Sequence, residues 1–164
     1  MKLWRPATFA LVLALGYTQA APCAPLQAAV FPFAFDDTSL EPPQPAELAR
    51  LHKIDAELRE LLAKSGKYTI IDITSIEAKA NESDLVSCQA CAVSLAKQLG
   101  AQVAVIAWVQ KVSNLILNIN AVIRSTATGD MVSAGSVDIR GNTDESWSRG
   151  VSYLVANRLL KKNP

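Results

Sequence analysis

Two periods of hydrophobic residues alternate along this chain and divide it into helical and extended segments. Between residues 46 and 65, leucine or isoleucine recurs every three or four positions and charged residues cover the opposite side, as in an amphipathic helix. Gly66 follows as the expected stop, because glycine readily adopts the left-handed conformation that ends many helices. The pattern predicts a long helix with one buried apolar stripe.

Three segments have the composition of strands. Residues 28–35 (AAVFPFAF) form an apolar run in which Pro32 indicates a sheet edge or a bulge. Residues 68–73 (YTIIDI) predict a second strand after a short connection. Residues 102–109 (QVAVIAWV) are almost continuously apolar, as expected of a strand that is buried on both faces.

The next two segments predict an antiparallel pair with one buried face. Residues 115–124 (LILNINAVIR) alternate between apolar and polar side chains. The apolar face carries Leu115, Leu117, Ile119, Ala121 and Ile123. The sequence Thr128-Gly129-Asp130 is typical of a turn, and residues 131–140 return as the next strand.

Two more helices complete the predicted elements, with a single helical turn near residues 76–80. Ser87 is the expected N-cap of a helix that reaches Leu99, and Asn142 followed by Glu145 is a capping-box signature for the last helix. The inner side of that last helix carries Trp147, Val151, Leu154, Val155 and Leu159.

The predicted order of elements is β-α-β-α-β-β-β-α. A strand–helix–strand start followed by a meander indicates an α/β (α+β) fold, in which helices pack against a mixed sheet.

The N-terminal residues have the pattern of a secretory signal peptide. Lys2 and Arg5 precede an apolar stretch at residues 7–17, which is shorter than the roughly 20 residues that span a bilayer. Small residues permit cleavage after Ala20 or after Ala28. We therefore expect a signal peptide at residues 1–28, a single α/β domain at residues 29–164, a periplasmic location in a Gram-negative-type envelope, and no stable membrane insertion after cleavage.

Charge argues against nucleic acid as a partner. The whole chain has a net charge of +1, and loss of Lys2 and Arg5 would leave 14 basic residues against 15 acidic ones. A nucleic-acid-binding protein needs a concentrated basic surface, and the only basic run is the terminal pair Lys161 and Lys162.

Cys88 and Cys91 form a C-x-x-C motif at the start of a predicted helix. A helix N-terminus stabilises a thiolate, so a thiol-disulfide redox protein with Cys88 as the nucleophile is one interpretation. However, no proline occurs between Pro45 and Pro164, which excludes the cis-proline loop of thioredoxin-like enzymes. A metal site would need two further ligands. We favour a structural disulfide, as expected in an oxidising compartment.

Other candidate chemistry is sparse, and the sequence predicts neither a cofactor, nor a metal site, nor enzymatic activity. The single histidine, His52, lies on the first predicted helix and has no second histidine to act with. Asp36 and Asp37 could bind a cation at a strand end, although solvated turn residues are the commoner role of such a pair.

A group of polar residues on the predicted meander is the candidate binding surface. It consists of Asn118, Asn120, Arg124, Ser136, Asp138 and Arg140, extended by the loop that ends at Trp147. Either these residues form an ordinary solvated sheet face, or they contact a periplasmic or envelope protein.

Several segments resemble known families. AAVFPFAFDD resembles the strand that begins the TolB amino-terminal domain and the related α/β domain of curli secretion channels, and AKQLGAQVAVIAWV and STATGDMV are similar to later motifs of these domains. KVSNLILNIN and RGNTDESW resemble a group of small secreted bacterial proteins, a domain of unknown function that consists of this domain alone. The resemblance implies a TolB-like fold and a non-enzymatic accessory or adaptor role in the periplasm.

Overall fold

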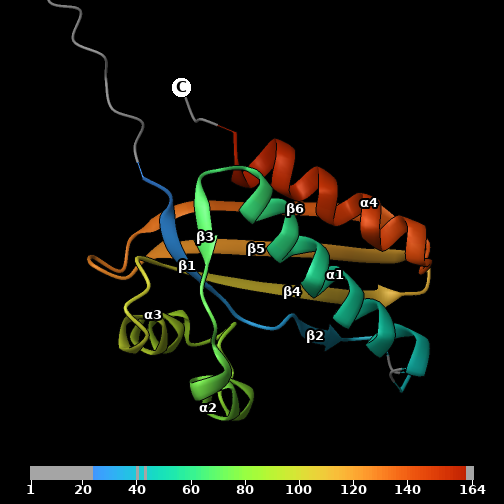
Figure 1. The fold of residues 1–164 in the computed structure, drawn as a ribbon. Coiled ribbons are helices and arrows are strands. Elements are labelled where there is room, and N and C mark those ends of the chain that lie inside the picture. Colours follow the sequence, from blue (N-terminus) through green and yellow to red (C-terminus); the bar gives the residue numbers. More distant parts are fainter. Residues whose placement is uncertain (1–23, 40, 43, 162–164) are drawn as a thin grey trace, which may run out of the picture.

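A computed structural model describes residues 24–39, 41–42 and 44–161, and it confirms the α/β fold with a six-stranded mixed sheet. Figure 1 shows the helices packed on both faces of this sheet. The strands are β1 (Leu26–Val30), β2 (Ala34–Asp37), β3 (Tyr68–Ile70), β4 (Val103–Ser113), β5 (Ile116–Ser125) and β6 (Met131–Arg140). The helices are α1 (Pro45–Lys64), α2 (Glu77–Glu82), α3 (Gln89–Gln98) and α4 (Asp144–Leu154), with a 3-10 turn at Thr74–Ile76 and a π-helical turn at Val155–Leu159.

The first strand is an interior strand of the sheet, between β3 and β4. The strand order is β3-β1-β4-β5-β6, and β1 runs parallel to both of its neighbours. β4, β5 and β6 form the antiparallel meander that the sequence predicted, and β2 pairs in parallel with the second half of β4.

Each face of the sheet has its own apolar core. α1 and α4 cover one face, where leucines and isoleucines of α1 meet Trp147, Val151 and Leu154 of α4. α2 and α3 cover the other face, where Ala92 and Ala96 pack against Ala104 and Ile106. α2 and α3 reach only one end of that face, so the two sides of the sheet are covered unequally (Figure 1).

The expected first strand, residues 28–35, is two strands. Phe31 still donates its amide to the Val105 carbonyl at 3.0 Å, but Pro32 has no amide hydrogen and the pairing stops there. The chain resumes as β2, opposite Trp108 to Lys111 further along β4.

Two predicted helix starts are one residue early. Cys88, and not Ser87, is the N-cap of α3, since the Cys88 carbonyl accepts the first amides of the helix, from Cys91 at 2.9 Å and Ala92 at 3.4 Å. Thr143, and not Asn142, caps α4 by accepting the Ser146 amide at 3.2 Å. Leu115 was wrongly placed on the buried face: it lies in the β4–β5 turn and is 72% exposed.

The proposed signal peptide falls mainly on residues 1–23, which lie outside the described residues, as does Cys23. The alternative cleavage point after Ala28 falls inside β1, where Ala28 is opposite Ile70 on one side and Val103 on the other. Among the described residues, none of the helices combines the length and the apolar character that crossing a membrane requires.

Candidate functional site

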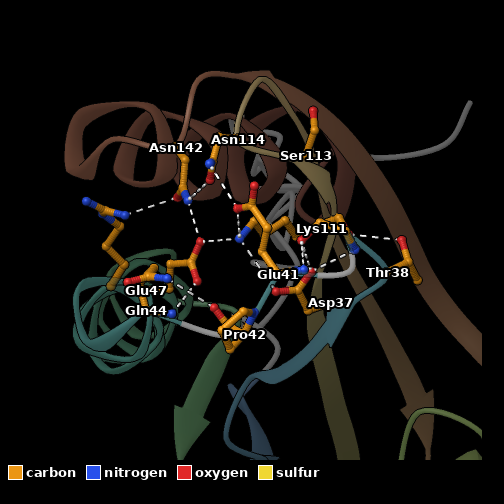
Figure 2. A network of polar contacts seen from close by, with 12 residues as sticks. Asp37, Thr38, Glu41, Pro42, Gln44, Glu47, Lys111, Ser113, Asn114 and Asn142 are labelled. Carbon is orange, nitrogen blue, oxygen red and sulfur yellow. Dashed lines mark hydrogen bonds and ion pairs between the residues drawn. The ribbon is translucent and has the colours of Figure 1, made fainter.

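A buried ion pair joins the end of β4 to the start of α1. The inward-facing positions of β4 are Val103, Val105, Ala107 and Val109, and the next inward position is Lys111. Its side chain is fully buried, and its Nζ lies 2.8 Å from Oε1 of Glu47, which is also fully buried. Figure 2 shows the two side chains pointing toward each other.

Other polar side chains close around this pair. Lys111 Nζ lies 3.5 Å from Oδ2 of Asp37 on β2 and 3.8 Å from Oε2 of Glu41. Asn142, in the loop before α4, donates its Nδ2 to Glu47 Oε1 at 2.5 Å and to Asn114 Oδ1 at 3.1 Å. We call these six residues the Lys111 network (Figure 2).

Asn142 links the network to the helices. Its Oδ1 accepts hydrogen bonds from Trp147 Nε1 at 3.0 Å and from Arg50 NH1 at 3.1 Å. Arg50 also contacts Asp144 Oδ1 at 2.7 Å through Nε. The network therefore connects β2, α1, the β4–β5 turn and the β6–α4 loop, which are far apart in the sequence.

Electrostatics keep both members of the central pair charged. Burial acts to raise the pKa of Glu47, but hydrogen bonds from the Gln44 amide, Lys111 and Asn142 outweigh it, so the pKa lies below its usual 4.5. Burial acts to lower the pKa of Lys111, but the bond and charge of Glu47 and the charge of Asp37 raise it above 10.5. A hydrogen bond from the Ser39 hydroxyl is the main cause of the lowered pKa of Asp37.

This arrangement suits a structural role better than catalysis. The Lys111 ammonium is protonated and buried, so it is neither a free base nor an accessible nucleophile. It also supplies the positive charge that a cation would bring to Asp37, Glu41 and Glu47. Asp37 thus serves as a buried partner of Lys111, whereas Asp36 points to the exposed side of β2.

Sequence reasoning missed this network for a definite reason. The predicted strand ends at Val109, whereas β4 continues to Ser113. The alternation along β4 therefore reaches Lys111, whose side chain points inward, two residues beyond the predicted end. The available signal was the alternation itself, which places a lysine on the core side of a strand. A buried lysine requires an acidic partner.

The predicted polar surface does lie on one face of the sheet. Register pairs Asn118 with Gln110 and Asp138, and Asn120 with Trp108 and Ser136. We call this the bare half of the sheet: Trp108, Gln110, Ile116, Asn118, Asn120, Ser136, Asp138 and Arg140, all half-buried or exposed. It is the part of the second face that α2 and α3 do not reach (Figure 1).

Hydrogen bonds order the centre of the bare half. Asn118 donates Nδ2 to Asp138 Oδ1 at 2.5 Å and accepts the Ser136 hydroxyl at 2.8 Å on its Oδ1. Ile116, at 44% exposure, adds an apolar element at the rim. The surface is thus a flat polar patch with apolar elements, of the kind found in protein interfaces.

Two of the predicted surface residues lie elsewhere. Arg124 donates to Gln89 of α3 at 2.6 Å and to the Gly129 carbonyl at 2.7 Å, so its guanidinium ties α3 to the β5–β6 turn. Trp147 is fully buried beneath α4 and belongs to the core. A helical residue that faces the sheet cannot also form part of an exposed loop surface.

The predicted disulfide between Cys88 and Cys91 is present. Cys88 is half-buried at the N-cap of α3, and Cys91, one turn later, is exposed. The Cys88 amide donates to the Asp84 carbonyl at 2.8 Å, so the covalent link holds the end of the preceding loop against the helix.

His52 lies at the edge of a cavity of about 490 Å³ between α1 and residues 71–77. Of the charged groups here, Arg59 contacts Asp55 at 2.9 Å, and Asp72 accepts both the amide and the hydroxyl of Thr74. The first pairing lies within α1 and the second within the loop after β3.

A family model matches residues 26–159, which is most of the chain, under the description "Protein of unknown function (DUF2380)". The chain belongs to this family. A search of curated proteins finds no significant match.

Solved structures support the fold assignment of this DUF2380 protein. The LpoB C-terminal domain from Salmonella enterica aligns with a TM-score of 0.54 and 15% identity, over 73% of this chain and 86% of that one. The PelC dodecamer from Paraburkholderia phytofirmans aligns with a TM-score of 0.54 and 12% identity, over 84% of this chain and 89% of that one. Lipoprotein GNA1162 from Neisseria meningitidis aligns with a TM-score of 0.53 and 16% identity, over 81% of this chain and 98% of that one. At these identities the likeness shows the fold alone. TolB from Acinetobacter baumannii aligns with a TM-score of 0.47 and 13% identity, over 82% of this chain and 28% of that one.

Proposed function

We propose that this DUF2380 protein is a non-enzymatic accessory protein of the bacterial periplasm that binds an envelope protein through the bare half of its sheet. The observation that supports this most directly is the unequal cover of the two sheet faces. One face is sealed by α1 and α4, whereas on the other face Ile116 is exposed and Trp108 and the asparagines of β5 are half-buried, beyond the part that α2 and α3 cover.

The chemistry of the chain agrees with a binding role. The buried charges of Lys111 and Glu47 are paired with each other, and Arg59 beside the cavity near His52 is paired with Asp55. A flat, partly apolar surface fits a protein partner better than it fits a small molecule, which needs a concave site. The similarity to the LpoB domain and to a lipoprotein supports an envelope location.

Site-specific photo-crosslinking in intact cells tests the proposal. A photoreactive residue in place of Asn120 reports on the bare half, and one in place of the exposed Glu60 on α1 serves as the control. We expect a discrete crosslinked product from position 120 and none from position 60. Equal crosslinking from both positions would contradict the proposal.

A second test uses alanine at Asn118, Asn120 and Arg140. We expect this variant to capture less partner while it unfolds at the wild-type temperature, because these side chains lie outside both cores. Unchanged capture would rule out the bare half as the binding surface.

The second candidate function is thiol-disulfide exchange, favoured by the exposure of Cys91 in the first turn of α3. A periplasmic redox protein would reduce insulin and would show a reduction potential in the range of known oxidoreductases. Cys91 is the more exposed of the two cysteines, since Cys88 is half-buried. A very low potential and no turnover would leave the disulfide with a structural role.

A further inference from the structure

Within residues 24–39, 41–42 and 44–161, no strand pairs with the outer edge of β6. β6 contacts β5 on one side and is the last strand in the sheet order. Because the Gly141 amide bonds the Leu115 carbonyl, the odd-numbered residues of β6 bond β5. The N–H and C=O groups of the alternate residues therefore point outward, and these residues are Ala134, Ser136, Asp138 and Arg140.

Natural sheets usually protect such edges with short strands, proline, lysine, bulges or a covering segment. The opposite edge strand, β3, has three residues, whereas β6 has ten and contains neither proline nor lysine. A bulge near Met131 interrupts one end only. The C-terminal half of β6 is thus a regular template for another strand.

A groove of about 350 Å³ runs beside this half of β6, between its edge and α4. Val137, Ile139, Gly150 and Tyr153 line it, so its floor is apolar. Helix α4 comes close to the sheet here, because a Cβ at Gly150 would lie 2.7 Å from Ile139 Cγ2. The charged lining residues are Arg140, Arg149 and Asp138. Arg149 contacts Glu145 at 3.2 Å, so Arg140 is the lining cation that has no acidic partner among the described residues.

We propose that this groove binds an extended, acidic segment of a partner protein, which adds to β6 as a further strand. The backbone edge would supply the hydrogen bonds, as in other cases of strand addition. Alternate side chains of the added strand point to opposite faces. Apolar ones would cover Ile139 and Tyr153 on the α4 side, and acidic ones would lie beside Arg140 on the other side.

This surface is the edge of the sheet, and the inference goes beyond the proposed function. Strand addition needs the outward amides of β6, whereas docking on the bare half needs side chains such as Asn118 and Asn120 of β5. Arg140 belongs to both surfaces, so the outward amides and the asparagines are the positions at which the two proposals can fail independently.

Model peptides of alternating sequence test the groove: acetyl-(Glu-Val)4-amide and its lysine counterpart acetyl-(Lys-Val)4-amide. Binding is measured by fluorescence anisotropy, and amide shifts in NMR spectra locate it. We expect the glutamate peptide to bind about tenfold or more tightly than the lysine peptide, with shifts confined to β6 and α4. Equal binding of both peptides would overturn the proposal.

Ser136→Pro removes an outward amide without removing a bond to β5, and Ser136→Ala is the matched control because it retains the amide but loses the contact with Asn118. We expect the proline variant to lose the glutamate peptide and the alanine variant to bind within about twofold of wild type. Wild-type binding by a folded proline variant would overturn the proposal.

A charge-reversed variant, Arg140→Glu with Arg149→Glu, leaves the backbone unchanged in case the proline variant fails to fold. It should prefer the lysine peptide; an unchanged preference would contradict the proposal. Sedimentation of the wild-type chain tests the other possible occupant of the edge, a second copy of this chain. Self-association that Ser136→Pro abolishes, without peptide binding, would assign the edge to a second copy of this chain and overturn the acidic partner.

Discussion

The two faces of the sheet use the same strands in opposite ways. On β5, Leu117, Ile119 and Ile123 point into the sealed face and are fully buried, while Asn118 and Asn120 alternate with them and point to the bare half. The sealed face ends in a buried charged network, whereas the bare half carries half-buried amides. At these positions of β5, the side chains on the sealed face contribute to the core, and those on the bare half lie outside both cores.

The largest expected effect comes from breaking the buried pair. Lys111→Met leaves Glu47 buried beside Asp37 without a counter-charge, so we expect a loss of about 3–5 kcal/mol in the free energy of unfolding, measured with urea. Lys64→Met is the control, since the exposed Lys64–Glu60 pair on α1 should contribute about 0.5 kcal/mol or less.

Adding Glu47→Gln to Lys111→Met should recover much of that loss, because both charges of the central pair are then removed together. If the double variant were as unstable as the single one, packing rather than charge would explain the effect.

The same pair predicts a pH window. Glu47 has a lowered pKa in the folded state, so its stabilisation is present above pH 4.5 and is lost as the pH falls through the folded-state value. Lys111 has a raised pKa, so its contribution is present below pH 10.5 and is lost as the pH rises further. The stability of the wild type should therefore converge on that of the double variant at both extremes, as measured by urea unfolding across pH.

An intermediate effect is expected where α4 approaches the sheet. Gly150→Ala would place a Cβ 2.7 Å from Ile139 and 2.8 Å from Ile119, so we expect a loss of about 1–3 kcal/mol. Ser152→Ala, on the exposed side of the same helix, should leave thermal unfolding unchanged. Equal melting temperatures for the two variants would show that α4 can shift away from the sheet.

A smaller effect is expected from the disulfide. Replacing Cys88 and Cys91 by serine removes a link across three residues, and such a short loop restricts the unfolded chain little. We expect a loss of about 1 kcal/mol or less. Reduced wild type should behave like the variant; a much larger loss would mean that the loop before α3 depends on the link.

The smallest effect is expected on the bare half. Asn120→Ala should change the free energy of unfolding by about 0.5 kcal/mol or less, whereas Ile119→Ala, its neighbour on the sealed face, should cost about 2–5 kcal/mol. Comparable losses from the two substitutions would show that the bare half is part of a core.

Hydrophobic periodicity predicted most of the fold. The long helix, the meander and the inner side of α4 came from repeats of 3.6 and 2 residues, which burial imposes directly. Periodicity did not predict the split of the first strand into β1 and β2. Pro32 is compatible with an edge, a bulge or a break, and only the position of β4 decides between them.

The candidate surface was predicted in part, and the network was not. Asn118, Asn120, Asp138 and Arg140 share a face because strand parity is a local property. The exclusion of Arg124 depends on Gln89 of α3, and the pairing of Lys111 with Glu47 depends on how α1 crosses the end of β4. Contacts between elements distant in sequence have no local signal.

The position of β1 inside the sheet also has a consequence during synthesis, because its two neighbouring strands are made later than β1 itself. Its parallel neighbour β4 follows it by about 75 residues, the separation between Gln27 and its hydrogen-bond partner Gln102. At roughly 5–20 residues per second, the ribosome needs about 4–15 s to supply that neighbour. Until then β1 has only β3 beside it and α1 over one face, so the edge of β1 that β4 covers stays exposed in the growing chain until the second half of the domain has been made.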